Sequence, residues 1–331
     1  MEIVRQKSTC CGATVRRFGG KRRQCKVCKR TWRIQPARHG PKRQRSLERR
    51  SKRVLERYRS NCVGSLAALA ASEEIVPSTV QKQVVRARDK MLRLSPPLPS
   101  FAAPHILLGD ALTQTFAGKE YTTYLLLGRQ LNSTRAVVCL VRTVLGHESG
   151  TGWQAAVATL PTAMHAQTKA LVCDGHAGLT SLAQRHGWVL QRCRFHLVQS
   201  LNKNLRLWYR ATPEAYWIHE LVHVVVESAD DERVTRALGL LGDYAKQTSN
   251  KEIASILRGL TQHFRDYRSY IYYPELHLPA TNNSCECSFR RVRALQDKAR
   301  GWRTPTSHAA WVRYALTSVP PICCNEGETI W

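Results

Sequence analysis

Acidic side chains are scarce in this sequence. Among its 331 residues, 24 Asp and Glu oppose 51 Lys and Arg, which leaves a formal net charge of +27. The excess is uneven, because residues 1–100 carry 26 basic and only 6 acidic side chains. A field of this sign attracts polyanions. We therefore expect nucleic acid as the partner, no small-molecule substrate, and a DNA-holding role for the first third of the chain.

Long apolar runs are also missing. No stretch approaches the roughly 20 apolar residues that cross a bilayer, and the first residues lack the apolar segment of a secretory signal. These absences predict a cytoplasmic protein that does not contact a membrane. In that reducing compartment the twelve cysteines are expected to be thiols and metal ligands, not disulfides. An apolar content of 43% is still enough to bury a core in two or three domains.

The first motif is a pair of cysteines, Cys25 and Cys28, separated by two residues. This spacing lets two thiolates hold one tetrahedral Zn²⁺, and the segment resembles a zinc-ribbon knuckle. We predict a zinc ribbon over residues 1–40 with one structural Zn²⁺. The predicted ligands are Cys11, Cys25, Cys28 and either Cys10 or His39. A degenerate knuckle without metal is the alternative, because Ser8 stands where a regular ribbon has its first cysteine.

A helix-turn-helix DNA-binding domain is predicted over residues 41–94. After a basic helix, Leu66, Leu69 and Ala70 lie on one face of a short helix, and Pro77 suits the first position of a second helix. The outward face of that helix is suited to base edges and phosphates. This face comprises Ser78, Thr79, Gln81, Lys82 and Arg86. An ordinary helical hairpin is the alternative, and a proline-rich linker is expected over residues 95–104.

Beyond the linker, the order of elements predicts an α/β fold. Strands are expected over residues 105–110, 121–130, 135–144 and 169–175, with a helix over 148–160. The first strand ends in Asp110, and the last has Asp174 at its carboxyl end, directly before the turn residue Gly175. Two such carboxylates meet at one edge of the sheet if their strands are parallel neighbours. A divalent cation would then neutralise their repulsion.

This arrangement resembles the ribonuclease H-like fold of DDE transposases. Two motifs make the resemblance specific to Mutator-type and related bacterial insertion-sequence transposases. Cys193-x-x-His196 is similar to their Cys-x-x-His signature, and "TNNSCECSFRRVRALQDKARGW" matches their Asn-Asn-x-x-Glu helix followed by Arg-Gly. The likeness covers roughly residues 104–318, and a zinc ribbon with a helix-turn-helix is a familiar front end for such enzymes.

The resemblance implies a ribonuclease H-like core in two parts, residues 105–196 and 279–331, interrupted by an all-helical insertion over 197–278. It also implies a catalytic triad that binds two Mg²⁺ or Mn²⁺ ions about 3.5–4 Å apart. The triad is Asp110, Asp174 and Glu286. A first-turn glutamate that complements the helix dipole is the ordinary explanation of Glu286, and both explanations can hold.

Other candidate residues have narrower roles. Cys193 and His196 are interpreted as active-site residues that hold the strand end or contact the scissile phosphate. DNA backbone contacts are expected from Arg290 and Arg300. Two rival acids, Glu148 and Glu275, are set aside because neither has the Asn-Asn context, and His219 with His223 is taken as a packed helix pair.

The sequence thus predicts a transposase that binds the ends of its own element and then cuts and joins double-stranded DNA. A homodimer on element ends and target DNA is expected, associated with the nucleoid of a bacterium or archaeon. Two alternatives stay open. One is a DNA-binding regulator that has lost catalysis, and the other is a ribonuclease H-like nuclease that cuts without joining.

Overall fold

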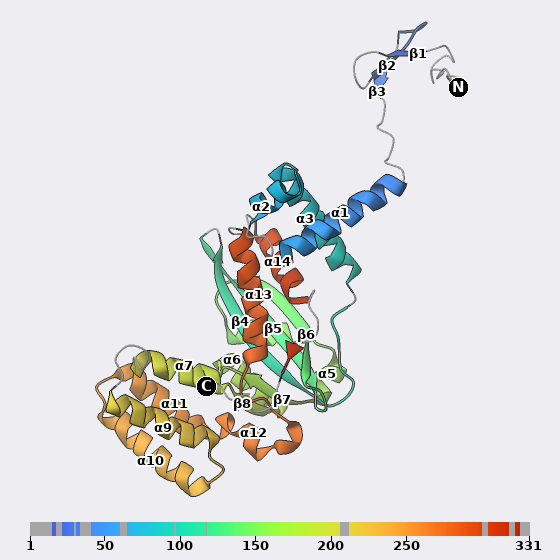
Figure 1. Ribbon diagram of the computed structural model, residues 1–331. Coiled ribbons are helices and arrows are strands. Elements are labelled where there is room, and N and C mark those ends of the chain that lie inside the picture. The colour runs from blue at the N-terminus through green and yellow to red at the C-terminus, as the bar shows by residue number, and fades with distance from the viewer. Residues whose placement is uncertain are drawn as a thin grey trace.

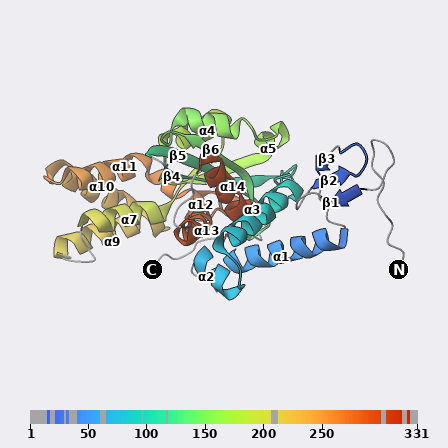
Figure 2. The same cartoon turned by 90° about the horizontal axis from the view of Figure 1, so that it is seen from above.

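The computed structural model describes most of the chain. The described residues are 15–17, 22–29, 31–33, 41–59, 65–95, 97–116, 118–205, 212–299, 304–317 and 322–324. The chain begins with a three-stranded antiparallel sheet of β1 (Val15–Arg17), β2 (Arg22–Cys25) and β3 (Thr31–Arg33). Three helices follow, α1 (Pro41–Arg59), α2 (Leu66–Ser72) and α3 (Pro77–Leu94). Figures 1 and 2 show these helices packed against the larger body of the protein.

A six-stranded mixed sheet forms the centre of the body. Its strands are β4 (His105–Phe116), β5 (Lys119–Gln130), β6 (Arg135–Leu145), β7 (Thr168–Cys173), β8 (Val189–Arg192) and β9 (Ile322–Cys323), in the order β8-β7-β4-β5-β6-β9. Strands β4, β5 and β6 are antiparallel neighbours. On the other side of β4, β7 and then β8 run parallel to it. The condition for Asp110 and Asp174 to meet is therefore fulfilled, because β4 and β7 are parallel neighbours.

Alternation of side chains along the strands gives the sheet two apolar faces. Leu107 faces the helices α4 (Gly150–Val157), α5 (Thr162–Gln167) and α6 (Ala177–His186), whereas Ile106 and Leu108 face α13 (Asn283–Ala299) and α14 (Pro305–Thr317). Such alternation is what a strand buried on both faces requires. The result is a three-layer α/β arrangement in which α13 packs against β4, the strand that contains Asp110 (Figure 1).

A group of helices interrupts the chain between β8 and α13. It comprises α7 (Arg194–Leu205), α9 (Pro213–Glu227), α10 (Asp231–Gln247), α11 (Lys251–Tyr267), α12 (Ser269–Tyr272) and the 3₁₀ turn η1 (Pro274–Leu276). These helices have a hydrophobic core of their own that includes Leu201, Val222, Leu241 and Leu257. Buried Arg268 braces them by donating to the carbonyl oxygens of Val225 (2.9 Å) and Ser228 (2.7 Å). Within the described residues, no helix is long and apolar enough to cross a membrane.

Two expectations for the central sheet and its first helix were wrong in their boundaries. Strand β4 does not end at Asp110 but continues to Phe116, because its pairing with β5 runs on to the Phe116–Lys119 pair. Asp110 therefore lies in mid-strand. The helix expected over 148–160 covers only Gly150–Val157, and a second helix, α5, precedes β7.

The second helix of the predicted helix-turn-helix begins as the sequence indicated. Val76 is its N-cap residue and Pro77 occupies the first helical turn, where a missing N–H costs nothing. Val80 and Val84 are buried, as are Leu69 and Ala70 of α2. All five residues predicted to face outward are exposed: Ser78, Thr79, Gln81, Lys82 and Arg86.

The start of α6 touches the start of α4 so closely that only glycine fits. A Cβ atom on Gly178 would lie 2.6 Å from the Cα of Gly150. We expect Gly178→Ala to lower the free energy of unfolding by about 1–3 kcal/mol, because one helix must shift. Gly239→Ala in α10 is the matched control, since its Cβ meets nothing within 4 Å. That change should stabilise by about 0.5–1 kcal/mol. Urea unfolding of both variants tests this, and equal effects would contradict the close approach.

Candidate active site

Asp110 is a buried carboxylate in the middle of the central sheet. Its side chain is 7% exposed. Oδ1 accepts a hydrogen bond from the Ala111 N–H at 2.8 Å, whereas Oδ2 is buried and has no hydrogen-bond partner among the described residues. Burial raises the pKa of Asp110 to about 8, and repulsion from Glu286 and Asp174 adds to the rise. The charge of His196 opposes this rise, but burial and the two acids outweigh it.

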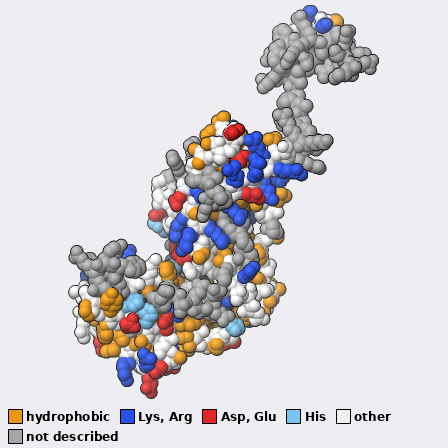
Figure 3. Space-filling model, viewed as in Figure 1, with side chains coloured by type: hydrophobic (Ala, Val, Ile, Leu, Met, Phe, Trp, Pro, Cys, Tyr) orange, Lys and Arg blue, Asp and Glu red, His pale blue; other side chains and the backbone are white. Residues whose placement is uncertain are grey.

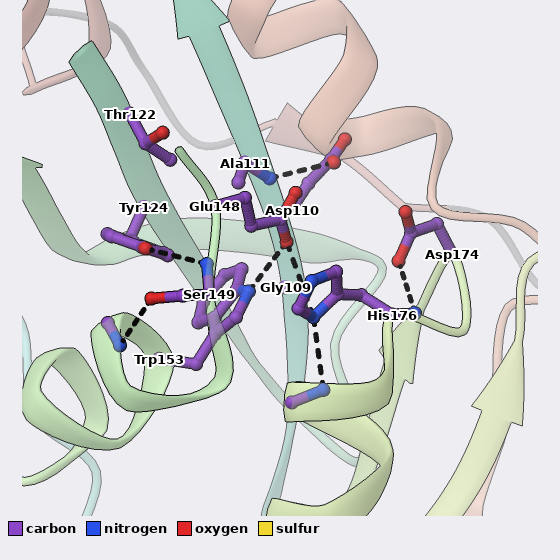
Figure 4. A network of polar contacts seen from close by, with 12 residues as sticks. Gly109, Asp110, Ala111, Thr122, Tyr124, Glu148, Ser149, Trp153, Asp174 and His176 are labelled. Atoms are coloured by element: carbon purple, nitrogen blue, oxygen red, sulfur yellow. Dashed lines mark hydrogen bonds and ion pairs between the residues drawn. The ribbon is translucent and has the colours of Figure 1, made fainter. Parts of the chain in front are cut away.

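Asp174 follows the last residue of β7, on the strand parallel to β4. The two strands pair Leu108 with Val172, so Asp110 and Asp174 both stand two residues beyond a paired position. Gly175, with φ of +97°, turns the chain toward α6. The half-buried Asp174 carboxylate accepts the His176 N–H at 2.9 Å across this turn (Figure 4). Neighbouring strands therefore deliver both acids to one region, as the sequence predicted.

Glu286 lies in the first turn of α13 and is coupled to His196. The His196 Nε2 and Glu286 Oε1 atoms are 3.4 Å apart, and Arg293 approaches the other oxygen at 3.7 Å. The hydrogen bond to His196 lowers the pKa of Glu286 against the opposing effect of burial. Burial would lower the pKa of His196, but the neighbouring Cys193 sulfur and the Glu286 carboxylate outweigh it, so that pKa is raised. His196 thus compensates part of the negative charge.

Asn282 ties the start of α13 to the sheet. Its buried side chain donates from Nδ2 to the Gly109 carbonyl at 2.8 Å, and its backbone N–H donates to the Cys193 sulfur at 3.1 Å. Cys193 in turn donates its backbone N–H to Cys173 at 2.7 Å. These contacts connect the segment before Glu286 with β4 and with the end of β8. Cys193 therefore has the contacts expected of a residue that holds the strand end.

The three acids suit a divalent cation in charge and chemistry. Asp110 has a buried oxygen that accepts no hydrogen bond from the described residues, and its carboxylate is repelled by Glu286 and Asp174. Carboxylate oxygens are the ligands that Mg²⁺ and Mn²⁺ prefer. In the described part of the chain, however, no three His, Cys, Asp or Glu side chains are already arranged to hold a metal ion. A cation at this position would have to draw the carboxylates closer together.

A second polar cluster that the sequence did not predict lies beside Asp174. Glu148 Oε1 accepts a hydrogen bond from the buried Trp153 Nε1 at 2.7 Å and lies 3.7 Å from His176 Nδ1. The same Nδ1 accepts the Gly178 N–H at 3.1 Å and so caps α6. Figure 4 shows the Glu148 carboxylate and the His176 ring on the side of the sheet where Asp110 and Asp174 lie. The glycine contact between α4 and α6 creates this cluster, and no local sequence pattern announces it.

The remaining predicted residues lie elsewhere. Glu275, the other rival acid, is exposed in η1. Arg290 is exposed on α13, whereas Arg300 falls outside the described residues. His219 and His223 lie side by side on α9, with ring centroids 4.5 Å apart and the ring planes tilted by 50°. Cys25 ends β2 and Cys28 follows in a turn, but Cys10, Cys11 and His39 lie outside the described residues.

Comparison with known proteins supplies an independent finding. A family model described as "Transposase, Mutator family" matches residues 115–315. The match includes Asp174, Cys193, His196 and Glu286 but begins after Asp110. A search of curated proteins gave no match.

The raised pKa of Asp110 predicts a pH-dependent stability difference in chelator-treated protein. Because the pKa of Asp110 in the folded state, about 8, exceeds the unfolded value, the contribution of Asp110 to wild-type stability falls as pH rises between about 4 and 8. Asp110→Asn cannot ionise and should escape this loss. We expect it to be more stable than wild type at pH 8 by at least about 1 kcal/mol, and the difference should vanish near pH 4.

Thermal unfolding across this pH range provides the measurement. Glu275→Gln is the control, because Glu275 is exposed and its substitution should leave the pH profile of the wild type unchanged. Parallel pH profiles for Asp110→Asn and wild type would contradict the assigned burial and repulsion.

Proposed function

This chain belongs to the Mutator family of transposases, and from that premise we propose that it cuts and joins DNA by metal-dependent phosphoryl transfer. The observation that carries the proposal is the convergence of Asp110, Asp174 and Glu286, brought from two parallel strands and a distant helix. A sheet with three antiparallel strands followed by two parallel ones supports a ribonuclease H-like core over residues 105–196 and 279–331. The helices between them correspond to the proposed insertion over 197–278.

Asp110, Asp174 and Glu286 would hold the catalytic Mg²⁺ or Mn²⁺. When bound, two such ions supply an activated water or 3′ hydroxyl and stabilise the charge of the leaving oxygen. The other residues of the site position the acids. Asn282 anchors the start of α13 to the Gly109 carbonyl, and His196 orients the Glu286 carboxylate. In this division of roles, the three carboxylates bind the metal ions, and Asn282 and His196 hold them in position.

The α3 helix is the proposed recognition helix for the ends of the element. Its exposed polar face begins at the first turn, where recognition helices present side chains to base edges. A zinc ribbon over residues 1–40 is also proposed, since Cys25 and Cys28 lie at the turn after β2 with the spacing of zinc ligands. This ribbon would add a further DNA contact. We propose that the chain acts as a homodimer, because two ends and a target must be held together.

Substitution of the three acids tests the catalytic proposal. Asp110→Asn, Asp174→Asn and Glu286→Gln should each lower Mg²⁺-dependent cleavage of end-containing DNA by at least about 10³-fold, because the amides keep shape but remove charge. Double substitutions should be hardly worse than single ones, since the acids act as one unit. Folding and DNA binding should be retained.

Two other acids serve as comparisons in the same assay. Glu275→Gln should cut like the wild type. Glu148→Gln should also retain cleavage, although Glu148 lies beside Asp174, because Trp153 already uses its carboxylate. Cleavage by all three triad variants would refute the proposal, and loss in Glu148→Gln with retention in Glu286→Gln would reassign the third acid. Cutting without joining would favour a nuclease.

Two neighbouring residues of α3 are expected to have different roles. Gln81→Ala should reduce the preference for the element's end over random DNA, because it removes a side chain suited to base edges. Lys82→Ala should weaken binding to both DNAs alike and reduce the salt dependence by about one unit of slope. Fluorescence anisotropy over a range of salt concentrations separates the two effects. Negligible changes in both variants would place recognition on another surface.

The zinc proposal predicts close to one Zn²⁺ per chain. Joint substitution of Cys25 and Cys28 by serine should abolish zinc binding and unfold the ribbon, because so short a segment cannot fold on an apolar core alone. Native mass spectrometry of the full chain measures the stoichiometry. Cys287→Ser, in α13, is the control and should keep the zinc. A wild-type chain with no zinc and a protease-resistant N-terminal segment would contradict this proposal.

A further inference from the structure

The predicted recognition helix and the catalytic helix share one hydrophobic core. Val80 and Val84 of α3 and Tyr58 of α1 belong to the same buried cluster as Phe289 of α13 and Trp311 of α14. The cluster continues into β4 and β7 of the central sheet. Figures 1 and 2 show α1 and α3 lying against α13 and α14. The segment between α3 and β4 therefore does not separate two independently moving bodies.

Arg88 of α3 reinforces this junction. Its side chain is 4% exposed, and its guanidinium group lies 4.8 Å from the ring centroid of Trp311. One nitrogen approaches the Ser307 Oγ at 3.4 Å, and another pairs with Asp89 at 2.6 Å. A buried, charged group held from several directions resists displacement, because any shift would leave the charge without compensation. Helices α3 and α14 are thus fixed relative to each other.

Helix α13 spans the distance from this junction to the active site. Near its far end, Lys298 donates to the carbonyl oxygen of Arg59 in α1 at 3.5 Å. Glu286 lies twelve residues earlier, which corresponds to about 18 Å along the helix axis. The Lys298 contact joins α13 to α1, which packs in turn on α3. The proposed recognition helix is therefore displaced from Glu286 by roughly 18 Å along α13, a separation that fits within one helical turn of DNA, which is about 34–36 Å.

A cationic stripe runs along α13 between the two places. Glu286, Arg290 and Arg293 follow one another at i, i+4 and i+7, which places them on the same face of the helix. Arg290 is exposed, and the Arg293 side chain is 52% exposed. Figure 3 shows Lys and Arg side chains over α13 and over α1–α3 on a single face of the protein. A DNA backbone can follow this face from α3 to Glu286.

We propose that one copy of the chain both recognises and cuts the same DNA end, with the recognised base pairs held at a fixed distance from the cut, within about one helical turn. The proposal rests on the proposed transposase function and adds the geometry of its substrate. Because α3, α13 and α14 share one core, Glu286 cannot move relative to α3. The cut should therefore fall at a constant spacing from the recognition sequence. A flexibly tethered recognition domain would instead tolerate changes in spacing.

Insertions in the DNA test the fixed distance without altering the protein. The probe is a duplex that carries the DNA flanking the gene for this chain, with the α3-dependent footprint mapped first by hydroxyl radicals. Inserting about half a helical turn between the footprint and the cut should lower cleavage of the original bond by at least about 100-fold and leave binding unchanged. Undiminished cleavage of the original bond would overturn the proposal.

Footprinting gives a second readout that does not need cleavage. Lys82→Ala and Arg290→Ala should each lose protection at a separate site on the same duplex, and the two sites should lie within about one helical turn of each other. Loss of protection by Lys82→Ala alone would overturn the proposed path along α13. If both sites are found but no bond is cut in Mg²⁺, the proposed catalytic function fails whereas the inferred geometry stands.

Two kinds of variant test the role of the single chain. Arg88→Ala should bind the same sequence but cut at scattered positions, whereas Arg93→Ala, an exposed change on the same helix, should cut at the original bond. Unchanged precision in Arg88→Ala would contradict its positioning role, and if that variant fails to fold the insertion series decides. At a salt concentration where Lys82→Ala alone neither binds nor cuts, adding Glu286→Gln chains should not restore cleavage. Efficient rescue would show that one copy recognises and another cuts.

Discussion

The site depends on one electrostatic constraint: a buried carboxylate whose charge the surrounding protein compensates only in part. Asp110 lies in mid-strand, and its Oδ2 atom is enclosed without a hydrogen bond from the described residues. Desolvation and the neighbouring acids raise its pKa to about 8. The protein nevertheless supports this arrangement with a parallel strand on one side and an anchored helix on the other. This costly feature is the reason for the proposal that a ligand of opposite charge binds here.

The architecture explains how three distant segments reach one place. Register between β4 and β7 aligns Asp110 with Asp174, and the Asn282 contacts with Gly109 and Cys193 fix the start of α13. The apolar face beneath α13 also receives α1, α3 and α14, so the same packing that positions Glu286 positions the exposed face of α3. The proposed recognition helix and the proposed catalytic glutamate therefore share one hydrophobic support.

Local patterns in the sequence predicted which helices and strands form better than they predicted where these begin and end. Pro77 marked the start of α3, and the apolar run before Asp174 marked β7. The continuation of β4 beyond Asp110 could not be predicted, because the polar residues from Thr113 to Thr115 hide a strand that pairing with β5 stabilises. The place of Glu148 was also hidden. It depends on the contact between Gly150 and Gly178, which are distant in sequence.

Calorimetric titration of the full chain with Mn²⁺ tests the central claim most directly. If a cation binds at Asp110, binding at pH 7 must displace the proton that the raised pKa retains. Titrations in buffers of different ionisation enthalpy should then report about one proton released per chain at pH 7 and almost none near pH 10. Asp110→Asn should release no proton. Mn²⁺ binding without proton release at pH 7, or with equal release from Asp110→Asn, would contradict the account.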